Sequence, residues 1–130
     1  MTDPILLRSD ASHIATLTLN APKSFNALSD AMLAALSQTL AEIAENPDIR
    51  VVVVKGAGRA FCAGHDLKEM QAARAAPDGG AAAFASLFAR CSAVMQSLRA
   101  AAQVNADVTY TTVVIESGAQ VEGRYSVTKT

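Results

Sequence analysis

Residues 56–70 place three glycines, a histidine and two acidic residues in a pattern that suits ligand binding or catalysis. Asp66 is a good helix N-cap, and Glu69 three residues later completes the spacing of a capping box. The backbone N–H groups around His65 would then lie at the start of a helix, which supplies no acceptor for them. Gly64 lacks a Cβ and lets a ligand approach the backbone closely. A carbonyl oxygen that becomes negative during a reaction, or a phosphate, suits such N–H groups. The alternative is a tight turn without a ligand.

A buried strand is expected to lead into this stretch. Residues 51–54 are four consecutive valines, and continuous β-branched residues are typical of a parallel strand buried on both faces. Before them, Ser29 is the expected N-cap of a helix that ends at Asn46–Pro47. The apolar residues of this helix recur at steps of three and four: Leu33, Leu36, Leu40 and Ile43. Strand, helix and strand predict a parallel crossover, and thus an α/β fold.

Two short strands are expected before that helix, at residues 5–9 and 13–19. The second alternates apolar and polar positions, as a half-buried strand does. Residues 9–12 are the expected turn between them. His13 then lies at a strand edge, where a structural or surface role is expected.

Two helices are expected after residues 56–70. The first runs to about Ala75, and the sequence Pro77-Asp78-Gly79-Gly80 ends it. The second covers residues 81–100. Its apolar stripe is predicted to be core: Phe84, Leu87, Phe88, Cys91, Val94, Met95 and Leu98.

Composition excludes several classes of partner. The 130 residues carry a net charge of -1, so no basic patch argues for nucleic acid or an anionic membrane surface. No apolar run is judged long enough to span a membrane. Two cysteines do not make a disulfide framework, and no targeting segment is recognised at the N-terminus. We therefore expect a cytoplasmic protein without a metal site.

Two segments resemble the enoyl-CoA hydratase/isomerase (crotonase) superfamily. Residues 61–70, FCAGHDLKEM, are similar to its first oxyanion-hole motif, and residues 17–28, LTLNAPKSFNAL, to its first coenzyme A-contacting segment. The resemblance covers about residues 5–100. It implies a crotonase-like ββα spiral, here truncated and followed by a short β-rich tail.

The resemblance also implies roles for individual residues. The backbone N–H of His65, beside Gly64, would be the first oxyanion donor. The residues expected to contact the coenzyme A thioester are Lys23, Phe25, Ala63, His65, Asp66, Leu67 and Lys68. Coenzyme A is then part of the substrate, and no permanently bound cofactor is expected. The His65 imidazole would line the acyl pocket, with proton transfer as the other option.

The remaining sequence departs from the family pattern. We divide the chain into residues 1–101, the N-terminal half of a crotonase-like domain, and residues 102–130, with strands at 108–115 and 120–130. Residues 113–124 weakly resemble the last coils of bactofilin-type β-helix proteins, and a generic hairpin is the alternative. No candidate is visible for a second oxyanion donor or for acid/base carboxylates.

Three functions therefore stay open. The chain is an acyl-CoA hydratase or isomerase of fatty acid metabolism, a catalytically incomplete acyl-CoA-binding remnant, or an assembly module driven by its β tail. Whether it is an enzyme is left undecided. An open sheet edge at the valine strand predicts a homo-oligomer.

Overall fold

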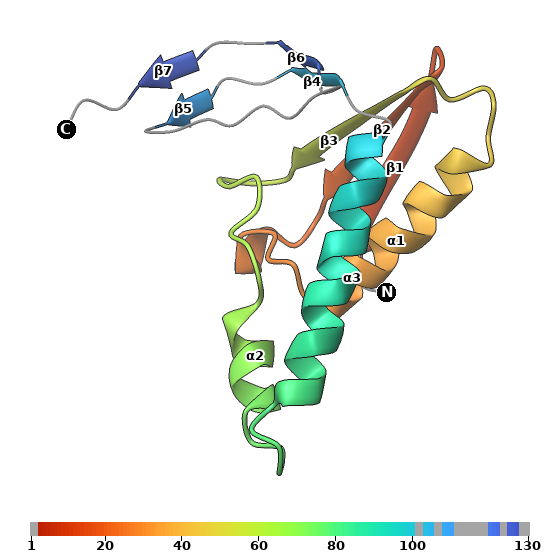
Figure 1. Ribbon diagram of the computed structural model, residues 1–130. Helices are drawn as coiled ribbons and strands as arrows, with labels where there is room; N and C mark the ends of the chain where they lie inside the picture. The colour runs from red at the N-terminus through yellow and green to blue at the C-terminus, as the bar shows by residue number, and fades with distance from the viewer. Residues whose placement is uncertain (1–2, 101–102, 106–107, 111–119, 123–124, 128–130) are drawn as a thin grey trace. The chain divides into compact units, whose positions relative to one another are not determined.

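The computed structural model describes residues 3–100, 103–105, 108–110, 120–122 and 125–127 (Figure 1). The chain divides into two compact units, residues 1–95 and 96–130, which are described separately. The first unit holds every residue of the predicted site.

A tight hairpin opens the first unit. Strand β1 (Leu6–Ala11) pairs antiparallel with β2 (Ile14–Leu19). Ser12 and His13 connect them with φ of 51° and 67°, and two consecutive positive φ angles are typical of a two-residue type I′ turn. The turn predicted at residues 9–12 is therefore wrong for residues 9–11, which belong to the first strand, and correct for Ser12.

The predicted parallel crossover is confirmed. Helix α1 (Asp30–Ala44) follows β2, and β3 (Val51–Gly56) returns parallel to β2, with Ile14 opposite Val51. The hydroxyl oxygen of Ser29 accepts a hydrogen bond from the Met32 N–H at 3.2 Å, so the predicted N-cap is present.

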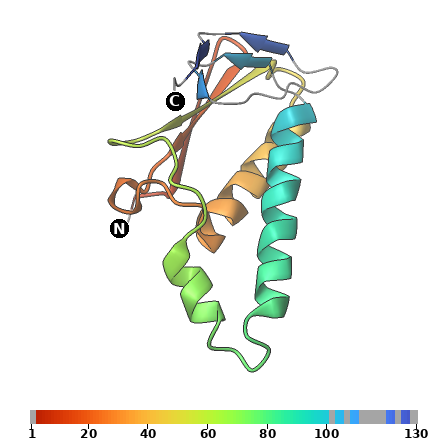
Figure 2. The same ribbon diagram turned by 60° about the vertical axis from the view of Figure 1, so that its left-hand side comes forward.

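The core of this unit lies between the sheet and α1. The inward-facing residues of β2 are Ala15, Leu17 and Leu19. The α1 residues that cover them are Met32, Leu33, Leu36, Leu40 and Ile43. Figure 2 shows α1 on one side of the three strands. Alternation along β2 and the period of α1 thus meet at one apolar layer.

The prediction that β3 is buried on both faces is wrong. Val51 is 49% exposed and Val53 is 41% exposed, whereas Val52 and Val54 are half-buried. The sheet order is β1-β2-β3, so in the part of the chain that the structure describes β3 pairs with β2 alone. The expected open sheet edge is therefore present.

Helix α2 (Leu67–Ala73) is two residues shorter than predicted, and α3 (Ala81–Ala100) follows the predicted break. The stripe on α3 is only partly core. Leu87 and Val94 are buried, but Phe88 is 50% exposed and Met95 is 43% exposed.

The sequence-based exclusion of a membrane span needs correction for α3. Residues 81–99 have a mean hydropathy of 1.2, and 11% of that stretch is buried. By length and composition alone this helix could cross a membrane, although core helices of soluble proteins pass the same test. Within the described residues, α3 is the one helix with this property.

The described residues of the second unit form four short strands. Strand β4 (Gln103–Asn105) pairs with β6 (Gln120–Glu122), and β5 (Val108–Tyr110) pairs with β7 (Tyr125–Val127). Both pairs are parallel, so the hairpin alternative is wrong for these strands. Residues 111–119 of the predicted strand and turn lie outside the described residues.

The carboxylate of Asp78 stabilises the start of α3. It accepts hydrogen bonds from the N–H groups of Gly80 at 2.9 Å and Ala82 at 3.0 Å. The N–H of Ala82, followed by that of Gly80, holds the pKa of the Asp78 carboxyl below its ordinary value of 3.8.

We predict that Asp78→Ala lowers the melting temperature at neutral pH, since two N–H groups lose their acceptor. Because the folded-state pKa is depressed, the contribution of Asp78 is fully present above 3.8 and is lost as pH falls through the folded-state value. Asp78→Asn is the matched control, which keeps an acceptor oxygen without the charge. Melting curves of both variants at neutral and acidic pH test this. Equal melting temperatures for wild type and Asp78→Ala would contradict it.

Candidate functional site

A buried amide joins the two segments that the sequence singled out. The side chain of Asn26 is 0% exposed. Its Oδ1 accepts a hydrogen bond from the Ala21 N–H at 2.8 Å, and its Nδ2 donates to the carbonyl oxygens of Ala57 at 2.9 Å and Ala60 at 2.8 Å. One side chain thus fixes its own loop and the loop after β3 to each other.

Backbone hydrogen bonds continue this connection toward His65. The Ala63 N–H donates to the Phe25 carbonyl at 2.9 Å, and the Leu28 N–H donates to the Gly64 carbonyl at 2.7 Å. Leu28 and His65 form an isolated parallel bridge. The two loops therefore run side by side, and the position of His65 is set by residues almost forty positions earlier in the chain.

The junction contains strained backbone. Phe25 and Asn26 have φ of 52° and 54°, which is uncommon for residues with a Cβ. Gly64 has φ of 96°, and a Cβ built on it would meet no atom within 4 Å. Gly64 is therefore required by its backbone angle and not by crowding. Such strain persists only where surrounding interactions fix it, and it is frequent at functional sites.

His65 presents an N–H group without an acceptor. Among the described residues, its backbone N–H donates to no backbone or side-chain atom. The residue is half-buried, and its ring packs at 60° against Phe88 with centroids 5.5 Å apart. Hydrogen bonds on both sides of this N–H hold the backbone, so the donor is preorganised for an incoming acceptor.

The predicted capping box is only half correct. Asp66 Oδ1 accepts from the N–H groups of Lys68 at 2.9 Å and Glu69 at 3.2 Å, which confirms the N-cap. Glu69 does not return this bond; its Oε2 accepts from the Asp30 N–H at 2.8 Å, at the start of α1. A Glu at this position finds an unsatisfied N–H on a neighbouring helix within reach, and so it caps that helix.

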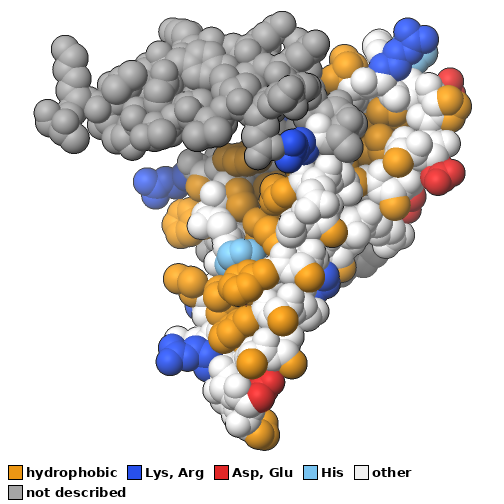
Figure 3. Space-filling view, viewed as in Figure 1, with side chains coloured by type: hydrophobic (Ala, Val, Ile, Leu, Met, Phe, Trp, Pro, Cys, Tyr) orange, Lys and Arg blue, Asp and Glu red, His pale blue; other side chains and the backbone are white. Residues whose placement is uncertain are grey.

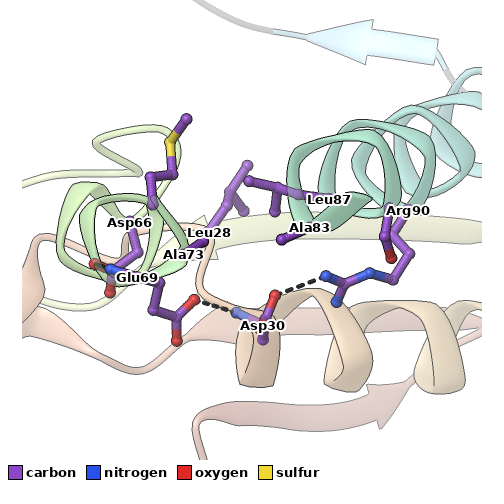
Figure 4. A pocket seen from close by; sticks show the side chains of 10 residues that line it. Leu28, Asp30, Asp66, Glu69, Ala73, Ala83, Leu87 and Arg90 are labelled. Carbon is purple, nitrogen blue, oxygen red and sulfur yellow. Dashed lines mark hydrogen bonds and ion pairs between the residues drawn. The ribbon is translucent and has the colours of Figure 1, made fainter. Parts of the chain in front are cut away.

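A small pocket lies beside this cap (Figure 4). Arg90 of α3 pairs with Asp30 Oδ1 at 2.8 Å, so Glu69, Asp30 and Arg90 connect α2, α1 and α3. The pocket measures about 110 Å³ and is lined by Leu28, Asp30, Asp66, Glu69, Met70, Ala73, Ala83, Ser86, Leu87 and Arg90. Asp66 lines this pocket, but His65 does not. The pocket is therefore next to the His65 N–H group in the sequence and does not include it.

The structure places the other predicted contact residues at the surface around the two loops. Lys23 lies in the short 3-10 helix Pro22–Ser24, and Lys68 in the first turn of α2; both are exposed. Leu67 is 75% exposed and Phe25 is 52% exposed, and Ala63 is exposed as well. Their contact with coenzyme A stays a prediction.

Sequence reasoning missed Asn26 and Arg90. A signal existed for Asn26, because asparagine tolerates positive φ and precedes a capped helix here. No local signal marks Arg90, whose partner lies 60 residues away in the chain.

Comparison with known proteins places this geometry in a family context. The sequence model of the enoyl-CoA hydratase/isomerase family matches residues 14–108. A Mycobacterium tuberculosis protein named as a probable enoyl-CoA hydratase is 46% identical over 70 residues, which are 54% of this chain and 27% of that protein. The 3-hydroxyisobutyryl-CoA hydrolase 1 of Arabidopsis thaliana is 45% identical over 62 residues, which are 48% of this chain and 16% of that protein.

Solved structures agree with the sequence match. The crystal structure of an enoyl-CoA hydratase from Mycobacterium smegmatis has a TM-score of 0.71 and 48% identity, over 82% of this chain and 40% of that chain. This confirms the expected crotonase-like α/β fold. The chain spans about a quarter or less of the length of the two curated relatives above. The bactofilin resemblance receives no support from these matches, and most of its residues lie outside the described part.

We predict that Asn26→Ala destabilises the fold strongly. It removes three hydrogen bonds and leaves one N–H and two carbonyl groups without their partner, at about 1–3 kcal/mol for each buried unpaired group. Asn20→Ala is the control, because Asn20 makes one side-chain bond, to the Pro4 carbonyl at an exposed position. Urea unfolding measures both free energies of unfolding. Similar losses for the two variants would contradict the central role of Asn26.

Proposed function

The chain belongs to the enoyl-CoA hydratase/isomerase family, and we propose that it binds acyl-CoA thioesters and polarises their carbonyl group with the backbone N–H of His65. The observation that carries the proposal is the preorganised His65 N–H, which has no acceptor among the described residues and lies between the loops that Asn26 joins. A thioester oxygen that gains negative charge needs such a donor. Removing one donor of this kind typically reduces the rate by about a hundredfold to a thousandfold.

The two loops around His65 carry charged and apolar side chains that suit binding of coenzyme A. Lys23 and Lys68 are exposed cations on the two loops, and lysine binds phosphate groups as a point charge. Phe25 and Leu67 expose apolar surface on the same loops. These features support the residue roles that the family resemblance implies.

We further propose that this chain by itself binds without turnover. Asp66 and Glu69 are the acidic residues nearest to His65 in sequence, and the carboxylates of both accept hydrogen bonds from helix N–H groups. A carboxylate engaged in capping is a poor candidate for proton transfer. The matched relatives carry the names of a hydratase and a hydrolase, so the shared segment does not specify one reaction.

Titration with crotonyl-CoA, following binding by calorimetry and the enoyl absorbance together, tests this proposal. We expect binding without loss of absorbance. Gly64→Ala should weaken binding at least tenfold, because the φ of 96° disfavours a Cβ and the His65 N–H would turn away. Gly79→Ala is a matched control: its φ is 68°, its Cβ would also meet no atom within 4 Å, and it lies outside the site.

Two outcomes would contradict this proposal. Absence of binding by the wild-type chain would remove the thioester site. Turnover by the purified chain would show that acid/base groups act here that the described residues do not reveal.

We also propose that the chain self-associates through the open side of its sheet. Four apolar side chains on one sheet face are 37–49% exposed: Leu7, Ile14, Val51 and Val53. In addition, β3 is an edge strand among the described residues. Exposed apolar edges favour pairing with another chain.

Sedimentation at increasing protein concentration should show a rising mean mass. Val53→Lys should reduce that rise, and Ala34→Lys on the exposed surface of α1 should not. A wild-type mass of 13.5 kDa at every concentration would contradict self-association.

A further inference from the structure

The ring of His65 contains an unusual nitrogen. Its Nδ1 is enclosed by the protein and has no hydrogen-bond partner within the described residues. Of the two ring nitrogens, only Nδ1 is both buried and without a partner among the described residues; Nε2 does not meet both conditions. Buried polar atoms without partners are rare, so this one calls for an explanation.

Burial of Nδ1 restricts where the ring carries its proton. A neutral imidazole has one N–H donor and one acceptor nitrogen, and which is which depends on their surroundings. An enclosed N–H without an acceptor is more costly than an enclosed acceptor without a donor. The favoured form therefore leaves Nδ1 bare and places the proton on Nε2.

The position of the ring is also fixed. Phe88 packs against it edge to face at 5.5 Å, and Phe84 stacks on Phe88 at 6.4 Å. Aromatic contacts of this geometry orient the rings. Figure 3 shows hydrophobic side chains gathered around a histidine on this face of the molecule. In such apolar surroundings a single polar donor has a large influence on which ligand is accepted.

We propose that His65 is a specificity-determining residue, whose ring donates a hydrogen bond from Nε2 to an oxygen atom on the acyl group of the bound thioester. The ligand half of this inference rests on the proposed function. The ring and the backbone N–H belong to one residue, so an acyl oxygen that reaches Nε2 lies within a few bonds of the carbonyl held by that N–H. The role is recognition of an acceptor, which differs from the proton transfer considered from sequence.

Nitrogen NMR of the ring tests the protonation state without any ligand. His13→Asn leaves His65 as the single histidine, and asparagine tolerates the φ of 67° at that turn. We expect the neutral form of the ring to carry its proton on Nε2 and to leave Nδ1 bare. A neutral ring with its proton on Nδ1 would overturn the inference.

Binding of a matched ligand pair tests the recognition. The wild-type chain should bind 3-oxobutanoyl-CoA, whose keto oxygen only accepts, roughly 3- to 10-fold more tightly than butanoyl-CoA. His65→Phe keeps the backbone N–H and an aromatic ring, and it should remove this preference, so that the two thioesters bind with similar affinity. His65→Gln, which again offers a donor, should restore part of it.

The outcomes separate the two proposals. If wild type binds both thioesters equally, or if His65→Phe keeps the preference, the role of the ring is refuted and the proposed function stands. If wild type binds neither thioester, the proposed function fails and the recognition role fails with it, whereas the NMR result still judges the state of the ring.

Discussion

The Asn26 amide is the interaction on which the site depends. It lies in the loop before α1 and is fully buried. Its Nδ2 donates hydrogen bonds to the carbonyl oxygens of Ala57 and Ala60. Its oxygen meanwhile holds the Ala21 N–H. Because an unpaired buried amide is destabilising, these groups can be satisfied only when both loops occupy their places together. The path of the chain from Ala57 to His65 follows from that condition.

A second set of contacts connects the three helices of the first unit. Glu69 of α2 caps α1, and Asp30, the first residue of α1, pairs with Arg90 of α3. These contacts are exposed, so each contributes little to stability. They join α2, α1 and α3, and Phe88 of α3 packs against the ring of His65. The two acidic residues nearest to His65 in the sequence, Asp66 and Glu69, both accept hydrogen bonds from helix N–H groups.

Within the described part of the first unit, the sheet is covered by α1 on one face. Residues of β2 that face α1 are buried, whereas Val51 and Val53 on β3 stay exposed together with Ile14. Four consecutive valines indicate a doubly buried strand, because no polar residue interrupts them. The structure supplies α1 on one side and no second apolar layer in the described part of the first unit. The valine pattern therefore predicts burial of both strand faces, whereas the described part of this unit buries one face.

Features that depend on neighbouring residues could be predicted from the sequence. The Ser29 and Asp66 caps, the strand–helix–strand order and the positive φ of Gly64 all follow from local residue types. The partner of Glu69 and the two bonds that Asn26 Nδ2 donates became visible only in the folded chain, since these bonds join residues 31 to 39 positions apart. Local patterns show that a polar group needs a partner, but the choice of partner depends on which elements the packed core brings within hydrogen-bond reach.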